Sequence, residues 1–226
     1  MRKIHLPGRK PLWEQVHQIL EKMIIYREID PGTRLHEENL SEQFGVSRGP
    51  IREAILALQK DGWVDIKHHQ GTFVRTPGKE EAKQLLEVRQ FLETKVVDLA
   101  ARRISDEKIH KIQDIVDRGF EALESNDIYA SIELNSQFHR KITEATNNIV
   151  LARLMEHVEK QVVWYLSAIM SFRGKESWPE HQKILDALKE RDPETAVKLM
   201  SNHTSATYQA YINSMKDESE KKDRGI

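Results

Sequence analysis

The chain has 226 residues, and 35 Lys and Arg against 36 Asp and Glu give it a formal net charge of −1. Cysteine is absent, which excludes disulfides and thiolate metal sites, so any metal must be held by His, Asp, Glu or Asn. No apolar run reaches about 18 residues, and Met1 to Lys10 shows no signal-peptide pattern. We therefore expect a soluble, cytoplasmic protein that makes no membrane contact, with two modest domains or one larger one.

The first third of the chain is mildly basic. Residues 1–76 carry 12 Lys and Arg against 10 Asp and Glu, whereas residues 77–226 carry 23 against 26. Four basic residues precede Leu12, where the first helical pattern begins. This terminal segment is either an arm that touches phosphate or a solvated, disordered end.

A supporting helix is predicted to begin at Leu12, because apolar residues recur from there with a period of 3.6 and stop near Arg27. Asp30-Pro31-Gly32 then predicts a turn. The apolar face of this helix is suited to carry the segment that follows it.

The stretch from Leu35 to Val74 predicts two short helices and a hairpin. Gly45 ends the first helix, and Ser47 is a good N-cap for the second. Strands are expected around Val64 and Phe73, with a tip formed by residues 67–71. The inward positions of the two helices, which let them share one small core, are Leu40, Phe44, Val46, Ile51, Ile55 and Leu58.

Arg48 and Arg52 lie four residues apart, on one face near the start of the second helix. In a helix-turn-helix this is the part that meets the major groove, where arginines suit phosphates and guanine edges. The hairpin tip has a composition that can approach a minor groove or its phosphates. The alternative is an ordinary capped helix with a solvated arginine face.

This segment resembles the winged helix-turn-helix of the GntR family of bacterial transcription regulators. The residues in register with the family signature are Leu40, Gly45, Val46, Ser47, Arg48, Pro50, Ile51, Arg52, Glu53, Ala54, Gly62 and Gly71. Gly49 departs from it, because Thr is usual there and a hydroxyl contact to DNA is lost. The resemblance implies that the chain binds a double-stranded DNA operator through Arg48, Gly49, Arg52, His69, Gln70, Gly71 and Thr72.

Thr76-Pro77-Gly78 is the predicted domain boundary, since Pro and Gly together end the second wing strand. A helical domain over 79–216 and a charged, disordered tail over 217–226 are expected to follow the DNA-binding domain, 1–76. Helices are predicted from 79, 106, 128, 149, 178 and 193, with the fourth reaching Met170 and a loop over 171–178. The fold class is therefore mainly α, with a winged helix-turn-helix and then a bundle of about six helices.

Three histidines fall on three different predicted helices. Asn135 and His139 share one helical face, His181 is near the start of the fifth helix, and His203 is in the last. Ligands from separate helices can converge inside a bundle, and imidazoles with an oxygen donor suit a divalent transition metal. The residues alone favour scattered surface or core histidines, because the chain has 10 of them.

The helical body resembles the FCD domain, the ligand-binding half of the FadR subfamily of GntR regulators. The family pattern is Asp-x-x-x-His, then Glu-His before an Ile-Leu-x-Ala-Leu run, then a final His one helix later. Its counterparts here are Asn135 to His139, Glu180 to Leu188, and His203. The resemblance implies a divalent metal, zinc first and manganese or nickel next, held by Asn135, His139, His181 and His203. Asn135 replaces the usual Asp and should weaken the site, and the alternative is an unmetallated cluster that contacts a ligand directly.

Arg89 is the remaining candidate. Glu87-Val88-Arg89 matches the family's Glu-x-Arg, in which the arginine is often aimed at an acidic effector. Its guanidinium suits a bidentate grip on a carboxylate, with the metal taking a second oxygen. The alternative is a helical pair with Glu93 on a solvated face.

The resulting prediction is a homodimeric, ligand-responsive transcription regulator, most simply a repressor, with a small organic acid as effector. Two DNA-binding domains on paired half-sites of the operator add their DNA contacts, which favours a dimer. One alternative keeps the DNA reader but gives the bundle a metal-free, apolar acyl-ligand pocket. A hydrolytic metal enzyme is the other, and it lacks a positioned base such as an HExxH pair, so we do not expect an enzyme.

Overall fold

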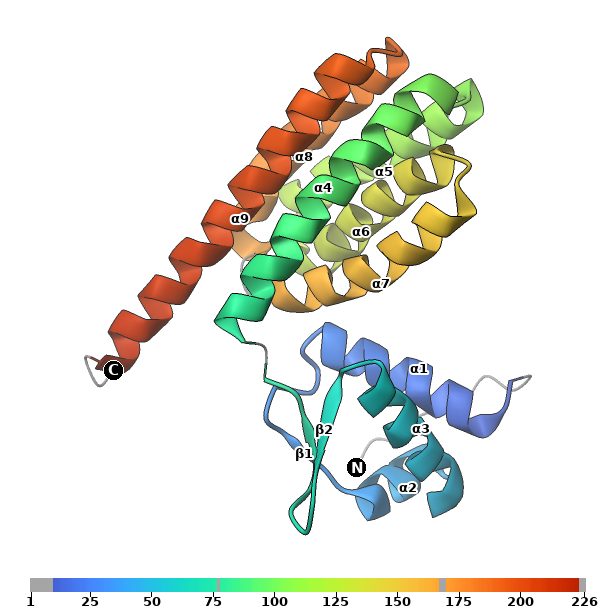
Figure 1. Ribbon diagram of the computed structural model, residues 1–226, viewed down its shortest axis with the longest axis vertical. Coiled ribbons are helices and arrows are strands. Elements are labelled where there is room, and N and C mark those ends of the chain that lie inside the picture. The colour runs from blue at the N-terminus through green and yellow to red at the C-terminus, as the bar shows by residue number, and fades with distance from the viewer. Residues whose placement is uncertain (1–9, 77, 167–169, 224–226) are drawn as a thin grey trace. The chain divides into compact units, whose positions relative to one another are not determined.

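The computed structural model describes residues 10–76, 78–166 and 170–223 (Figure 1). The chain divides into two compact units, residues 1–78 and 79–226, and each is described by itself. The predicted basic arm lies outside the described residues except for Lys10. No helix among the described residues combines the length and the apolar character needed to span a bilayer.

The first unit is a winged helix-turn-helix, as predicted. Its elements in chain order are α1 (Leu12–Ile25), β1 (Arg34–Leu35), α2 (Glu37–Phe44), α3 (Arg48–Lys60), β2 (Val64–Lys67) and β3 (Gly71–Val74). Gly45 ends α2 in the left-handed conformation, with φ 66°, which the missing Cβ permits. Ser47 holds the N-cap position of α3, although its side chain makes no capping hydrogen bond.

The core of this unit forms where α1 packs on α3. The fully buried side chains of Val16, Leu20 and Ile24 from α1 meet Ile51 and Leu58 from α3. Spacings of three, four and seven residues place these side chains on one face of each helix. The support helix was therefore correctly predicted, and it holds α3 with its opposite face in solvent.

The wing contains one more strand than the sequence predicted. The strand order is β1-β3-β2, all antiparallel, and β1 adds Arg34 opposite Phe73 to the expected hairpin. Lys67 and Gly71 pair at the end of the ladder, so the tip is shorter than predicted. A strand of two residues cannot show an alternating pattern, which explains why β1 was missed.

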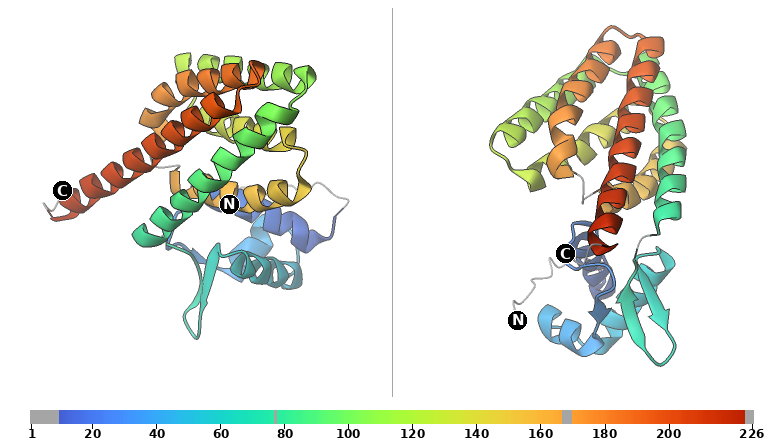
Figure 2. Two further views of the ribbon diagram at one scale, coloured as in Figure 1. Left: turned by 45° about the horizontal axis from the view of Figure 1, so that its top comes forward. Right: turned by 90° about the vertical axis from the view of Figure 1, so that its left-hand side faces the viewer.

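The second unit is a bundle of six helices in its described part, which confirms the predicted architecture. The helices are α4 (Lys79–Arg103), α5 (Asp106–Glu124), α6 (Ile128–Ala145), α7 (Ile149–Leu166), α8 (Met170–Lys189) and α9 (Pro193–Asp223). α4 and α9 run side by side in every view (Figures 1 and 2). Ser105 and Asp127 cap α5 and α6 with their side chains, as expected.

The predicted loop over residues 171–178 is wrong, because α8 begins at Met170 and continues through Pro179. Proline removes one helical hydrogen bond, but contacts of the residues just before it support the helix. The Ser177 hydroxyl donates to the Arg173 carbonyl at 3.0 Å, and Trp178 is buried. Pro-Glu after Trp178 resembled a helix start, whereas it lies in the middle of one.

The predicted disorder of the charged tail is also wrong as far as Asp223, because α9 continues to that residue. Lys and Glu are strong helix formers. Charge alone therefore gave the wrong expectation. The predicted end of the fourth helix at Met170 falls beyond α7 across residues 167–169, which lie outside the described residues.

Gly119 in α5 allows α8 to approach closely. A Cβ atom at Gly119 would lie 2.4 Å from atoms of the Trp178 ring, and this ring is held by a hydrogen bond from its Nε1 to Ser131 Oγ. We expect Gly119→Ala to lower the free energy of unfolding by about 1–3 kcal/mol through overpacking. Urea denaturation measures this, with Gly49→Ala as the control because its Cβ would meet open space. Equal stability of Gly119→Ala and the wild type would contradict the packing described.

Candidate functional site

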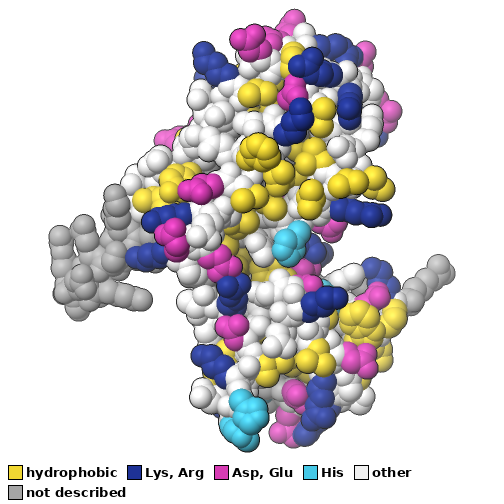
Figure 3. Space-filling view, viewed as in Figure 1, with side chains coloured by type: hydrophobic (Ala, Val, Ile, Leu, Met, Phe, Trp, Pro, Cys, Tyr) yellow, Lys and Arg dark blue, Asp and Glu magenta, His cyan; other side chains and the backbone are white. Residues whose placement is uncertain are grey.

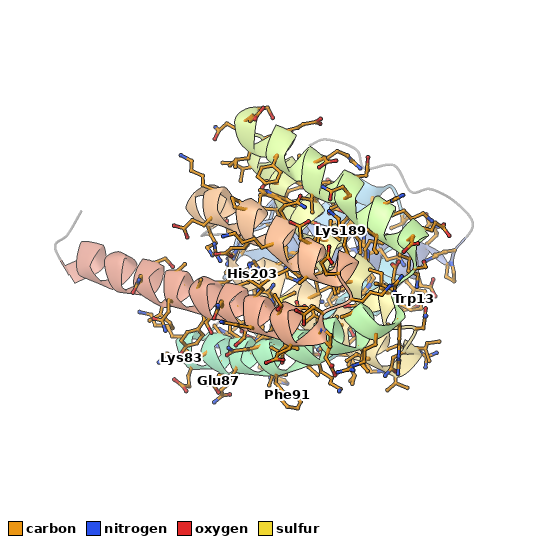
Figure 4. All side chains as sticks on the ribbon, turned by 90° about the horizontal axis from the view of Figure 1, so that it is seen from above. Trp13, Lys83, Glu87, Phe91, Lys189 and His203 are labelled. Carbon is orange, nitrogen blue, oxygen red and sulfur yellow. The ribbon has the colours of Figure 1, made fainter. Side chains whose placement is uncertain are left out.

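The three predicted histidines converge inside the bundle. His139 comes from α6, His181 from α8 and His203, which is labelled in Figure 4, from α9, and none is more than 2% exposed. Their ring centroids are 4.7–5.4 Å apart, and one nitrogen from each lies within 4.8 Å of the others. Packing has therefore brought three potential metal ligands to one point.

The hydrogen bonds of the three rings differ. His203 Nδ1 lies 2.7 Å from Glu180 Oε2, which leaves the other ring nitrogen for a ligand. His139 Nε2 lies 3.2 Å from an Arg89 guanidinium nitrogen, and its Nδ1 is 2.9 Å from Glu93 Oε1, off line for a hydrogen bond. Neither nitrogen of the fully buried His181 has a partner among the described residues.

Neighbouring rings fix the orientation of His181. Phe138 stacks on it with centroids 4.1 Å apart, and Trp178 meets it edge to face at 5.0 Å. Burial lowers the pKa of His181 well below its usual value, and the neighbouring His203 and His139 lower it further. The ring is thus held neutral. It carries one N–H donor and one lone-pair acceptor, and leaving both without hydrogen bonds in a buried site costs folding free energy.

Arg89 and Glu93 form a buried pair beside the cluster. Their Nε and Oε1 atoms are 3.5 Å apart, and both side chains are almost fully buried, so the alternative of a pair on a solvated face does not apply. Burial raises the pKa of Glu93, but His139 and Arg89 outweigh this and lower it to about 2. One guanidinium nitrogen, Nη1, and Glu93 Oε2 have no partner among the described residues.

A small cavity opens next to this pair. Its lining residues are Arg89, Glu93, Asn135, Ser136, His139, Met155, Val158, Glu159, Val162 and Val163. Asn135 and Arg89 therefore face the same space from α6 and α4, beside one of the clustered histidines. The cavity has a charged side and an apolar side, but its volume of about 10 Å³ has room for about one water, so a larger polar ligand would have to move its walls.

Two functional candidates were not found from the sequence. Arg173 is 1% exposed and donates to Glu180 Oε2 at 2.5 Å, so it holds the carboxylate that holds His203. Arg173 was missed because residues 171–178 were predicted to be a loop. Its spacing from Glu176 and Glu180 is nevertheless that of residues on one helical face. Glu159 is the other, and its signal was an acid on the same helical face as the apolar Met155, Val158, Val162 and Val163 of α7.

Protonation of the buried histidines is expected to destabilise the protein at acidic pH. Burial lowers the pKa of His203 to about 4, despite the opposing Glu180, whereas an unfolded histidine titrates near 6.5. The unfolded chain binds more protons between these values, so stability is complete above about pH 6.5 and falls toward pH 4.

For His203 alone the loss is on the order of 3 kcal/mol by pH 4, of which about 2 kcal/mol has already been lost at pH 5. Urea denaturation of chelator-treated protein between pH 7.5 and 5 measures it, with His203→Gln expected to be less pH-dependent than the wild type. Exposed His157→Gln is the control. If the unfolding free energies of His203→Gln and the wild type depend on pH in the same way, the lowered pKa of His203 is contradicted.

The face of α3 that was predicted to bind DNA is exposed. Arg48 donates to Glu38 Oε1 at 2.6 Å, and Arg52 donates to Glu37 Oε2 at 2.7 Å, with both arginines more than half exposed. Such exposed pairs are weak and exchange readily for phosphate or base contacts. Gly49 lies between them with open space around it, so nothing in the fold requires glycine there.

The wing tip displays the other predicted DNA contacts. His69 adopts φ 59° at the turn, and Gln70 N bonds to Lys67 O at 3.0 Å. Gly71 has φ 108° and lies close to the Arg34 side chain, which leaves no room for a Cβ without a shift. Thr72 follows it in β3, so the four residues lie together at one end of the sheet.

Comparisons with known proteins agree with this division. Residues 12–74 match the gntR family of bacterial regulatory proteins, and residues 84–206 match the FCD domain. The chain is 26% identical over 196 residues to the HTH-type transcriptional repressor RspR of Escherichia coli, covering 86% of each chain. It is 32% identical to the HTH-type transcriptional regulator LutR of Bacillus subtilis, covering 74% of this chain and 85% of LutR.

A solved structure shows the same fold. E. coli McbR/YncC superposes with a TM-score of 0.75 and 26% identity over 90% of this chain and 100% of that one. RspR and LutR are both named as transcription regulators, which agrees with the expectation that the chain is not an enzyme. The chain therefore belongs to the GntR family of bacterial regulatory proteins, in the branch that carries an FCD domain, and is a DNA-binding transcription regulator.

Proposed function

We propose that this regulator is a homodimeric repressor whose bundle senses a small carboxylate at a divalent metal ion. The observation that carries the proposal is the unsatisfied, buried His181 within a triad of histidines, next to a cavity that Arg89 also lines. Buried polar groups without partners are costly and are expected where a ligand completes them.

The residues present fit a metal ion. Three imidazoles, held largely neutral by burial, would bind it together with the Asn135 amide oxygen, and this donor set suits zinc, with manganese or nickel as alternatives. A bound divalent ion would supply a Lewis-acidic position for one carboxylate oxygen. Because Asn135 brings no charge where the family pattern has Asp, we expect weaker binding than an acid there would give.

Arg89 is the proposed effector-binding residue. Arg89 lines the cavity, its Nη1 has no partner among the described residues, and its Nε lies 3.5 Å from Glu93 Oε1. Arg89 occupies the lone pair of His139 Nε2 at 3.2 Å, so a metal bound to that nitrogen would have to displace this contact. The charged lining of the cavity favours this carboxylate over the metal-free acyl ligand.

The DNA reader is proposed to use α3 and the wing tip. Arg48, Gly49 and Arg52 would face the major groove, and His69, Gln70, Gly71 and Thr72 would reach the minor groove or its phosphates. The effector would act by favouring one of two arrangements of the DNA-binding domains. This requires that the effector bind the protein with different affinity in the two arrangements.

Dimerisation is proposed to use an apolar face of the bundle. Figure 3 shows hydrophobic side chains gathered on one face of this unit, and Figure 4 shows Phe91 pointing away from α4. Phe91 is 74% exposed, and Val150 and Leu154 of α7 are also exposed. A patch of this kind, in a protein predicted to bind paired half-sites, fits a contact with a second copy.

A charge in this patch is expected to separate the dimer. We expect Phe91→Glu to be monomeric at micromolar concentration, because the partner would have to bury an unpaired carboxylate. Sedimentation velocity measures the change, with Ile66→Glu as a control at an exposed apolar residue of the wing. A Phe91→Glu dimer as stable as the wild type would place the interface elsewhere.

The proposed function is tested on an operator selected from random duplexes. Fluorescence anisotropy of this DNA should report tight binding, which is released by at least one small organic acid in the presence of zinc. Treatment with a chelator should abolish the release and leave DNA binding intact. Release that is indifferent to chelator and to added metal would contradict metal-dependent sensing.

A further inference from the structure

The cavity wall supplied by α7 contains one acid. Met155, Val158, Val162 and Val163 line the cavity with apolar surface, and Glu159 lies among them on the same helical face. Burial, reinforced by the charge of Glu93, raises the pKa of Glu159 to about 8. An acid in this environment costs stability unless something in the cavity binds it.

Oxygen atoms without partners face this cavity from three elements. Glu159 Oε1 on α7, Ser136 Oγ on α6 and Glu93 Oε2 on α4 have no hydrogen-bond partner among the described residues. All three can accept a hydrogen bond, whereas Arg89 offers an unpartnered donor. The cavity is therefore equipped for an anion at Arg89 and for a hydrogen-bond donor elsewhere.

We propose that Glu159 is a specificity-determining residue, and that it binds a hydroxyl or ammonium group which the effector carries in addition to its carboxylate. The effector is then a hydroxy acid or an amino acid, and not a plain carboxylate. This inference rests on the proposed function, in which Arg89 binds the carboxylate.

The chemistry of Glu159 suits both kinds of donor. A protonated carboxyl can accept from and donate to a hydroxyl, and an ionised one can pair with an ammonium group. Glu159 Oε1 has no hydrogen-bond partner among the described residues, although the charges of Arg140 and Arg89 lower the pKa of Glu159 in opposition to burial. The apolar neighbours of Glu159 would cover the carbon atoms between the two polar ends of such an effector.

Matched ligands separate these possibilities. Isothermal titration of the zinc-loaded full chain is made with propionate, lactate and alanine, and again with succinate, malate and aspartate. In at least one set, the acid with a hydroxyl or ammonium group should bind about tenfold or more tightly than the acid without one. A preference for the hydroxyl or for the ammonium member identifies the donor.

Variants of Glu159 test the residue itself. Glu159→Leu should lose this preference while binding the plain acid at least as well, and Glu159→Gln should keep a hydroxyl preference but lose an ammonium preference. Exposed Glu156→Gln on the same helix is the control. Thermal melting should show Glu159→Leu to be no less stable than the wild type, because the change removes a partly buried acid whose Oε1 has no partner among the described residues.

The outcomes distinguish this inference from the proposed function. Equal binding of all three acids in both sets, or a preference that survives in Glu159→Leu, overturns the role of Glu159 while Arg89-dependent carboxylate binding can stand. A lower melting temperature of Glu159→Leu also overturns it, because Glu159 is then structural. Absence of binding by every acid overturns the proposed function and this inference with it.

Discussion

Alanine in place of Arg52 is expected to weaken specific operator binding by about 1–3 kcal/mol for each DNA-binding domain, if the guanidinium contacts a base edge. Both DNA-binding domains of a dimer carry the change, so the loss ranges from roughly 30-fold to more than 10⁴-fold. Among the described residues of the free protein, Arg52 pairs with the partly exposed Glu37. Loss of such a pair costs little stability, so the folded dimer should be unaffected.

Electrophoretic mobility shift or anisotropy on the selected operator measures the effect of Arg52→Ala. Arg102→Ala is a matched control, because Arg102 also forms an exposed ion pair, with Asp98 on α4, and lies in the other unit. A normal circular dichroism spectrum and an unchanged sedimentation coefficient would show that only recognition was lost. Wild-type affinity of Arg52→Ala for the operator would remove Arg52 from the DNA interface.

The second large effect expected is that substitutions at His139 and Arg89 separate metal binding from the response to the effector. His139→Ala should lose most of its metal and its effector response together, since one of three imidazole ligands is removed. Arg89→Lys should retain the metal but lose the response, because a lysine ammonium cannot replace the bidentate fork. Lysine also keeps a positive charge beside the buried Glu93, which alanine would leave unpaired.

Metal content and acid-induced release of operator DNA measure this pair of variants. Both proteins should bind the operator like the wild type in the absence of acid, because the changes lie in the helical unit. A normal response in Arg89→Lys would assign the carboxylate to another cation. Full metal content in His139→Ala would exclude His139 from the site.

Much of this fold could be predicted because its signals are local. The amphipathic periods, the Gly45 turn and the Ser105 and Asp127 caps each determine a helix or its end from a few neighbouring residues. The meeting of His139 with His181 and His203 depended on resemblance, since residues 42 and 64 positions apart carry no local sign of contact.

The parts that were missed depend on tertiary packing. Pro179 lies inside α8 because the buried Trp178 holds that helix in the bundle, a contact that no helix-boundary rule includes. Glu159 matters because Glu93 lies near it, from a helix more than 60 residues earlier. Arg173 is important through Glu180, which in turn contacts His203. Such chains of contacts become visible only when the helices have been packed.

The central claim is that the buried histidines hold a metal that takes part in effector binding, and elemental analysis tests it most directly. Protein purified without chelator should contain close to one divalent ion per chain, and His181→Ala should contain little. Asn135→Asp should hold the ion more tightly than the wild type, because a charged oxygen replaces a neutral one. A wild-type protein without metal, whose melting temperature and acid binding do not change when zinc, manganese or nickel is added, would contradict the claim and leave the histidines as direct ligand contacts.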